Sequence, residues 1–225
     1  VQDLNVMPWR ILAITFTNKA AKEMRERIGA LLSEDVARDI WVSTFHALAV
    51  RILRRDGENI GLSRNFTIID TSAQRTLMKR VINDLNLDTN QYEPRTVLGM
   101  ISNAKNDMLR PKDYAQQADN AFQETVAEIY AAYQAELKRA QSVDFDDLIM
   151  LTIDLFQSSP DVLARYQNQF DYLHVDEYQD TNDAQYTIVN MLAQRSQNLA
   201  VVGDADQSLS LIHIWRCRRY SLCRS

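Results

Sequence analysis

Two short apolar stretches that each end in acidic residues constrain the fold of this chain more than any other feature. The first, YLHVDE, covers residues 172–177, and the second, LAVVGD, covers residues 199–204. They lie about 28 residues apart, with one amphipathic stretch between them, which is the length of a strand–helix–strand crossover. Such a crossover predicts two parallel strands whose carboxyl ends meet at one edge of a sheet. Open α/β sheets place their ligands at that edge.

The beginning of the chain shows the same alternation. RILAITFT (10–17) and IWVSTF (40–45) are rich in β-formers and predict buried strands. NKAAKEMRERIGALL (18–32) and HALAVRILRRDG (46–57) predict helices, the first capped by Thr17 or Asn18. Further helices are predicted in DFDDLIMLTIDLF and NDAQYTIVNMLAQ. We therefore expect an α/β fold, a RecA-like parallel sheet with helices on both faces.

A mostly helical insertion is expected to interrupt this pattern. After a short predicted strand, FTIID, residues 66–141 contain three stretches with helical periodicity: SAQRTLMKRVINDLNL, EPRTVLGMISNAKNDML and DNAFQETVAEIYAAYQAELKRA. Their methionine and tyrosine stripes are typical of a helical core. We divide the chain into a first part of the α/β domain (1–65), the insertion (66–141), a second part of the α/β domain (142–208) and a tail (209–225).

The tail differs from the rest of the chain in composition. It holds both cysteines, four arginines and no carboxylate. Without it, 21 lysines and arginines face 30 carboxylates, a net charge of −9 instead of −5. The two cysteines lack the neighbouring ligands of a zinc site. We interpret residues 209–225 as a non-native tail that does not pack with the domain.

Composition excludes several classes of protein. No apolar run approaches the roughly 20 residues of a membrane helix, and the first residues lack the pattern of a signal peptide. The first 208 residues contain no cysteine, which fits a reducing compartment. We expect a cytoplasmic protein without a membrane partner. The acidic net charge argues against non-specific coating of nucleic acid, although it leaves room for a narrow binding track.

The acidic strand ends suggest nucleotide chemistry. In nucleotide triphosphatases, the acid that ends such a strand holds Mg²⁺, which bridges the β- and γ-phosphates. Asp176 would take that role, and Glu177 would orient and deprotonate the attacking water. Gln207, in GDADQS, could reach the γ-phosphate. The alternative for Asp176 and Glu177 is a helix N-terminal cap, which acidic residues favour.

Longer motifs decide between these alternatives. VDEYQDTNDAQY and VVGDADQS resemble motifs II and III of superfamily 1 DNA helicases of the UvrD/Rep/PcrA type. AITFTNKAAKEMRERI resembles motif Ia of that family, and STFHALAVRILRR resembles the strand–helix motif that follows it. SVDFDDLIMLT resembles the segment that returns from the family's inserted subdomain. The matches occur in the family's order and span residues 1–208.

The resemblance implies the first motor domain of an ATP-driven helicase that translocates 3′ to 5′ on single-stranded DNA in repair or replication. ATP and Mg²⁺ would be its cofactors, and single-stranded DNA and single/double-strand junctions its partners. By position, Asp176 would bind Mg²⁺, Glu177 would be the catalytic base, and Gln207 would couple the nucleotide state to DNA. The residues along the DNA track would be Thr15, Phe16, Asn18, Thr44 and His46.

The physical chemistry of these side chains is compatible with that track. An aromatic ring at a strand end can stack on any base, and hydroxyl and amide groups hold phosphates without reading sequence. Taken alone, Phe16 and His46 are more typical of core positions, so the resemblance carries their assignment.

The chain also departs from the family pattern. The phosphate loop G-x-x-x-x-G-K-[ST] does not occur in it, a second RecA-like domain is missing, and the motif III pattern is lost at residue 209. We therefore expect an inactive fragment of a helicase. The alternatives are the motor part of a helicase–nuclease subunit, a non-catalytic DNA-binding module, and a Mg²⁺-dependent phosphohydrolase that uses its carboxylates alone.

Overall fold

The computed structural model describes residues 6–204, and within them the main sheet has four parallel strands. The strand order is β2-β1-β5-β6, with bounds Trp41–Thr44, Ile11–Thr15, Tyr172–Val175 and Leu199–Val201. All three pairings are parallel. The predicted parallel α/β sheet is therefore confirmed, and its two acid-ended strands are neighbours.

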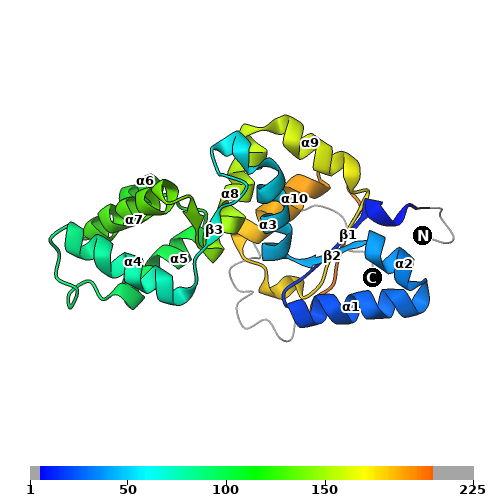
Figure 1. Ribbon diagram of the computed structural model, residues 1–225, viewed down its shortest axis with the longest axis horizontal. Helices are drawn as coiled ribbons and strands as arrows, with labels where there is room; N and C mark the ends of the chain where they lie inside the picture. The colour runs from blue at the N-terminus through cyan, green and yellow to red at the C-terminus, as the bar shows by residue number, and fades with distance from the viewer. Residues whose placement is uncertain (1–5, 205–225) are drawn as a thin grey trace.

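Helices cover both faces of this sheet, because alternate residues of each strand point to opposite sides. Leu12 and Ile14 of β1 pack with α3, α8, α9 and α10. Ala13 packs on the other face with α1 and α2. Figure 1 shows these two layers above and below the strands. The bounds of the helices are α1 Asn18–Leu31, α2 Glu34–Asp39, α3 Phe45–Asp56, α8 Phe145–Ser158, α9 Pro160–Gln169 and α10 Asp183–Ala193.

Polar side chains fix where these helices begin. Thr17 caps α1 by accepting a hydrogen bond from Ala20 N (3.0 Å). Thr44 caps α3 in the same way, and the helix therefore begins at Phe45. The second strand was predicted as residues 40–45 and spans Trp41–Thr44, so the prediction was one residue too long at each end; the Thr44 cap ends the strand before Phe45.

Residues between the two sheet halves form a separate helical lobe, at the left of Figure 1. It consists of α4 Thr71–Asp84, α5 Pro94–Asn106, α6 Pro111–Gln116 and α7 Ala121–Arg139. Its buried side chains form a core of their own, which includes Met78, Ile82, Ile101, Val126, Ile129 and Tyr133. The predicted insertion helices are confirmed as α4, α5 and α7.

The chain enters and leaves the lobe through a small parallel pair, β3 Thr67–Ile68 and β4 Ser142–Val143. Short 3₁₀ turns occur at Pro8–Arg10, Gly57–Ile60 and Tyr178–Asp180. None of the helices in the described part of the chain combines the length and hydrophobicity needed to cross a membrane.

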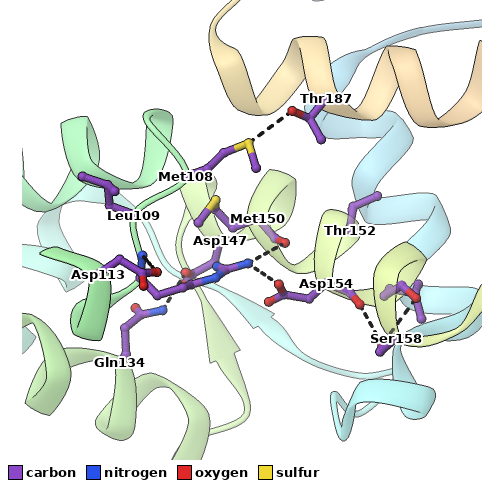
Figure 2. Close-up of polar contacts among 12 residues, drawn as sticks. Met108, Leu109, Asp113, Gln134, Asp147, Met150, Thr152, Asp154, Ser158 and Thr187 are labelled. Atoms are coloured by element: carbon purple, nitrogen blue, oxygen red, sulfur yellow. Dashed lines mark hydrogen bonds and ion pairs between the residues drawn. The ribbon is translucent and has the colours of Figure 1, made fainter. Parts of the chain in front are cut away.

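A buried ionic cluster joins the lobe to the sheet domain. Lys105 of α5 is 1% exposed, and its Nζ lies 2.7 Å from Asp144 Oδ2 and 2.8 Å from Asp147 Oδ1. Burial lowers the pKa of Lys105, but the carboxylates of Asp147 and Asp144 more than offset it, so the pKa is raised. Gln134 of α7 donates to Asp147 (2.9 Å), as Figure 2 shows.

Candidate active site at the carboxyl edge of the sheet

The strand register brings the candidate site residues to one edge of the sheet. Ile14 lies opposite Val175, and Val175 lies opposite Val201. Beyond these pairs, Asp176 N donates to the Ile14 carbonyl (3.0 Å). The residues that follow β1, β5 and β6 therefore emerge side by side, as the crossover predicted.

Asp176 and Glu177 leave β5 with different backbone conformations. Asp176 is half-buried, and its Oδ1 accepts a hydrogen bond from Glu177 N (3.0 Å). Glu177 is exposed and has φ 50° and ψ 42°, the left-handed region. A non-glycine residue pays about 1–2 kcal/mol for this conformation, and such strain concentrates at functional sites. The turn places two adjacent carboxylates at the carboxyl edge of the sheet.

These carboxylates do not cap the following helix. Asn182 caps α10, because its Oδ1 accepts from Gln185 N (2.8 Å) while Gln185 Oε1 accepts from Asn182 N (3.3 Å). Glu177 precedes the 3₁₀ turn at Tyr178 without a side-chain capping bond. The structure thus contradicts the alternative in which Asp176 and Glu177 serve as helix caps.

The chemistry of Asp176 fits a magnesium ion. Mg²⁺ keeps several waters and binds through one or two carboxylates together with substrate phosphates. Within residues 6–204 no group of three or more histidine, cysteine or acidic side chains could hold a metal by itself. A half-buried carboxylate at the open edge of the sheet, such as Asp176, suits an ion that shares its ligands with a nucleotide.

Two residues expected on the DNA track are buried. Thr15 is 0% exposed, and its hydroxyl donates to the Thr17 carbonyl (3.2 Å). Thr44 is 8% exposed, and its hydroxyl accepts from Ala47 N (3.3 Å). Both hydroxyls therefore make local hydrogen bonds that hold the turns after β1 and β2, and the place of these two residues along the DNA track remains a prediction.

Phe16, Asn18 and His46 lie at the surface or close to it. Phe16 is half-buried and packs edge-on against Phe45, with ring centroids 5.5 Å apart. Asn18 is exposed at the start of α1. His46 is half-buried at the start of α3.

A further aromatic residue, Phe145, belongs with His46. Their rings meet edge-on with centroids 5.9 Å apart, although the two residues come from different helices. Phe145 is 49% exposed at the start of α8. Sequence reasoning treated this stretch as a helix and as the return segment of the insertion, and it missed Phe145 as a site residue. The available signal was an aromatic residue among three aspartates at a helix start.

The pKa of His46 is lowered because burial disfavours its charged form, and the carboxylate of Asp146 opposes this effect only in part. The imidazole is therefore predominantly neutral at pH 7, and it offers one donor and one acceptor instead of a charge. Gln207, the third residue expected in the nucleotide site, lies outside the described residues.

Fold and site together define a RecA-like α/β domain, with acidic residues at the carboxyl edge of its sheet and a helical insertion. The model of the UvrD/REP helicase N-terminal domain matches residues 1–219. The chain therefore belongs to the UvrD/REP helicase family.

Curated relatives share most of this sequence. The chain is 88% identical to the ATP-dependent DNA helicase PcrA of Leuconostoc citreum over 216 residues, which are 96% of this chain and 28% of that protein. It is 53% identical to the PcrA helicase of Bacillus subtilis over 212 residues, 94% of this chain and 28% of that protein. The chain thus spans little more than a quarter of the length of these relatives.

Proposed function

We propose that this sequence is part of an ATP-dependent DNA helicase that moves 3′ to 5′ along single-stranded DNA with Mg²⁺ as cofactor. The chain would supply the carboxylates of the nucleotide site and one wall of the DNA track. The observation that supports this most strongly is the pair Asp176 and Glu177 at the carboxyl edge of a parallel sheet, where neither side chain caps the following helix.

The two carboxylates would have different roles. Asp176 is half-buried and fixed by Glu177 N, which suits a ligand that holds Mg²⁺ with its waters. When bound, the ion would neutralise charge on the phosphates. Glu177 is exposed at a strained turn, and its carboxylate would orient and deprotonate the attacking water.

The DNA track would run along Thr15, Phe16, Asn18, Thr44 and His46, together with Phe145. Partly exposed aromatic rings offer stacking surfaces that accept any base, and a neutral histidine and an asparagine can hydrogen-bond without sequence preference. This composition favours single-stranded DNA over a duplex, because stacking requires bases that are not paired. The junction with duplex DNA would be contacted by parts that the longer relatives contain.

A helicase–nuclease subunit with the same motor is the second candidate within this class. A simple DNA-binding module is less consistent with two adjacent carboxylates at the carboxyl edge of the sheet that do not cap the following helix. Nuclease activity of the complete protein on single-stranded DNA would favour the helicase–nuclease alternative.

The deciding experiment compares Glu177→Gln and Asp176→Asn in a polypeptide that carries this sequence over the full length of its relatives. Glu177→Gln keeps size and hydrogen-bonding reach but cannot accept a proton, so ATP should bind while hydrolysis falls about 10²–10⁴-fold. Asp176→Asn should also weaken Mg²⁺-dependent nucleotide binding, because the metal loses a charged ligand.

Single-turnover hydrolysis and nucleotide affinity measure these two effects separately. Asp183→Asn is the matched control, because Asp183 is an exposed aspartate at the start of α10 outside the proposed site. It should hydrolyse ATP at the parent rate. Near-parental hydrolysis by Glu177→Gln would show that Glu177 is not the general base.

The direction of movement has its own test. A 3′-to-5′ translocase should displace streptavidin from a biotin at the 5′ end of single-stranded DNA and leave a 3′-end block in place. Faster release from the 3′ end would contradict the proposed polarity.

A further inference from the structure

The loop after β5 and the loop after β6 are joined by two hydrogen bonds that the roles proposed above do not use. Tyr178 N donates to the carbonyl of Val202 (2.9 Å). The side-chain carbonyl oxygen of Gln179, Oε1, accepts a hydrogen bond from Asp204 N (3.1 Å). The two loops therefore form one hydrogen-bonded unit at the carboxyl edge of the sheet.

Gly203 lies between Val202, whose carbonyl accepts the first hydrogen bond, and Asp204, whose amide donates the second. The side chain of Gln179 lies against Gly203. A Cβ atom at position 203 would lie 2.7 Å from Gln179 Oε1 and 3.4 Å from Gln179 N. Gly203 does not have a positive φ, so its backbone conformation is open to any residue. A side chain at position 203 would therefore displace Gln179 Oε1, the end of a flexible side chain, from the Asp204 amide.

Glu177 directly precedes the residues that make these contacts. Glu177 is not a glycine, so its left-handed backbone conformation is strained. Such a conformation persists only where surrounding contacts hold it. One support is local, because the Glu177 carbonyl accepts from Asp180 N (3.0 Å). The other supports are the bonds of Tyr178 and Gln179 to the β6 loop.

We propose that Gln179 is a positioning residue for Glu177. Its side chain ties the turn that carries the Glu177 carboxylate to the end of β6, so that the carboxylate has a fixed place relative to Asp176. The inference rests on the proposed function, in which Glu177 acts on the attacking water. A displacement of about 1 Å in such a group can reduce turnover about 10²-fold.

The hydrogen bond itself can be tested in this chain without any activity. Gln179→Ala removes the acceptor of the Asp204 amide, and Gln179→Met does so while it keeps the length of the side chain. Both variants should show faster hydrogen exchange at Asp204 N than the parent, while the amides of β1 keep their protection. Unchanged exchange at Asp204 in both variants would overturn the proposal.

The catalytic consequence needs the polypeptide that spans the full length of the relatives. Gln179→Ala should lower the kcat of DNA-stimulated ATP hydrolysis by about 10- to 100-fold, with little change in the KM for ATP and in the thermal midpoint. A purely structural role would lower the midpoint and leave kcat per folded molecule at the parent value.

A double-mutant cycle with Gly203→Ala makes the test specific. Gly203→Ala should lower kcat as Gln179→Ala does, because the new methyl group displaces Gln179 Oε1. In the Gln179→Ala background the same change should have no further effect, since the atom it displaces is absent. Gly99→Ala is the matched control: a Cβ at this exposed helical position meets nothing within 4 Å, and kcat should be unchanged.

The outcomes separate this inference from the proposed function. If the unmodified polypeptide hydrolyses no ATP in the presence of DNA and Mg²⁺, the proposed function fails. If it hydrolyses ATP and the two single variants match it, or if their effects on kcat simply add, the positioning role of Gln179 is wrong and the proposed function stands.

Discussion

His46 combines partial burial with a place on the proposed DNA track. Its imidazole packs edge-on against the exposed ring of Phe145, and burial lowers its pKa below the usual value near 6.5. The folded protein therefore favours the neutral ring more than the unfolded chain does. Protonation of His46 therefore destabilises the folded state. The free energy of unfolding should fall as the pH drops below neutrality.

The first prediction follows from this sign. The stability that neutral His46 contributes is fully present above about pH 6.5 and is lost as the pH falls through its lowered folded pKa. The unfolding free energy of the parent, relative to His46→Gln, should therefore decrease between pH 7.5 and pH 5. The slope for one proton is at most about 1.4 kcal/mol per pH unit. Urea unfolding of both proteins at several pH values measures it, and a difference independent of pH would contradict the prediction.

At the residue scale, the sequence predicted side-chain chemistry better than side-chain environment. Asp176 and Glu177 could be placed at a strand end because apolar runs and acids are visible in the sequence. The burial of Thr15 and Thr44 could not be predicted, because the same hydroxyl can bind a phosphate or a nearby backbone group. The left-handed backbone of Glu177 could not be predicted either, because contacts from a distant loop hold it.

At the scale of elements, the junction of α5 with α8 depends on one buried cation. Lys105 compensates two buried carboxylates, and Tyr133 also donates to Asp144 (3.1 Å). Burial raises the pKa of Asp147 even though Lys105 opposes the effect, since two carboxylates share one ammonium group. The cluster links the helical lobe to the helix that returns the chain to the sheet.

The second prediction concerns this cluster. Lys105→Met leaves Asp144 and Asp147 buried without a cation, and it should reduce the unfolding free energy by about 3–5 kcal/mol. Arg80→Met is the control, because Arg80 reaches Glu136 (2.9 Å) with an exposed side chain and that pair should contribute no more than about 1 kcal/mol. Equal losses in denaturant unfolding of the two variants would show that burial does not set the strength of the Lys105 cluster.

Element length explains which helices the sequence could predict. The long helices α4, α5 and α7 span enough turns to show an apolar stripe, and they were predicted. Helices α2 and α6 have six residues each, fewer than two turns, and the periodicity of so short a stretch carries little information. The two-residue strand β4 is defined by its pairing with β3, a contact between residues about 75 positions apart.

At the scale of the whole molecule, the described residues bury two large hydrophobic clusters. One cluster lies between the main sheet and the helices α3, α8, α9 and α10. The other lies among α4, α5 and α7. Figure 1 shows the two lobes that contain these clusters, joined at β3 and α8. The domain boundaries expected from the sequence, at residues 65/66 and 141/142, remain a prediction, and Phe66 packs in the cluster of the main sheet.

The third prediction tests whether the lobes open independently. Ile129 is 0% exposed in the helical lobe, and Ile153 is 1% exposed in the sheet domain. Each change to alanine should cost about 2–5 kcal/mol in the lobe that contains it, because a buried side chain is replaced by a cavity. With independent lobes, Ile129→Ala should speed native-state hydrogen exchange in α4, α5 and α7 and leave the amides of β1 and β5 protected. Ile153→Ala should speed hydrogen exchange in β1 and β5. If both variants instead lose protection throughout the molecule, the two cores form a single cooperative unit.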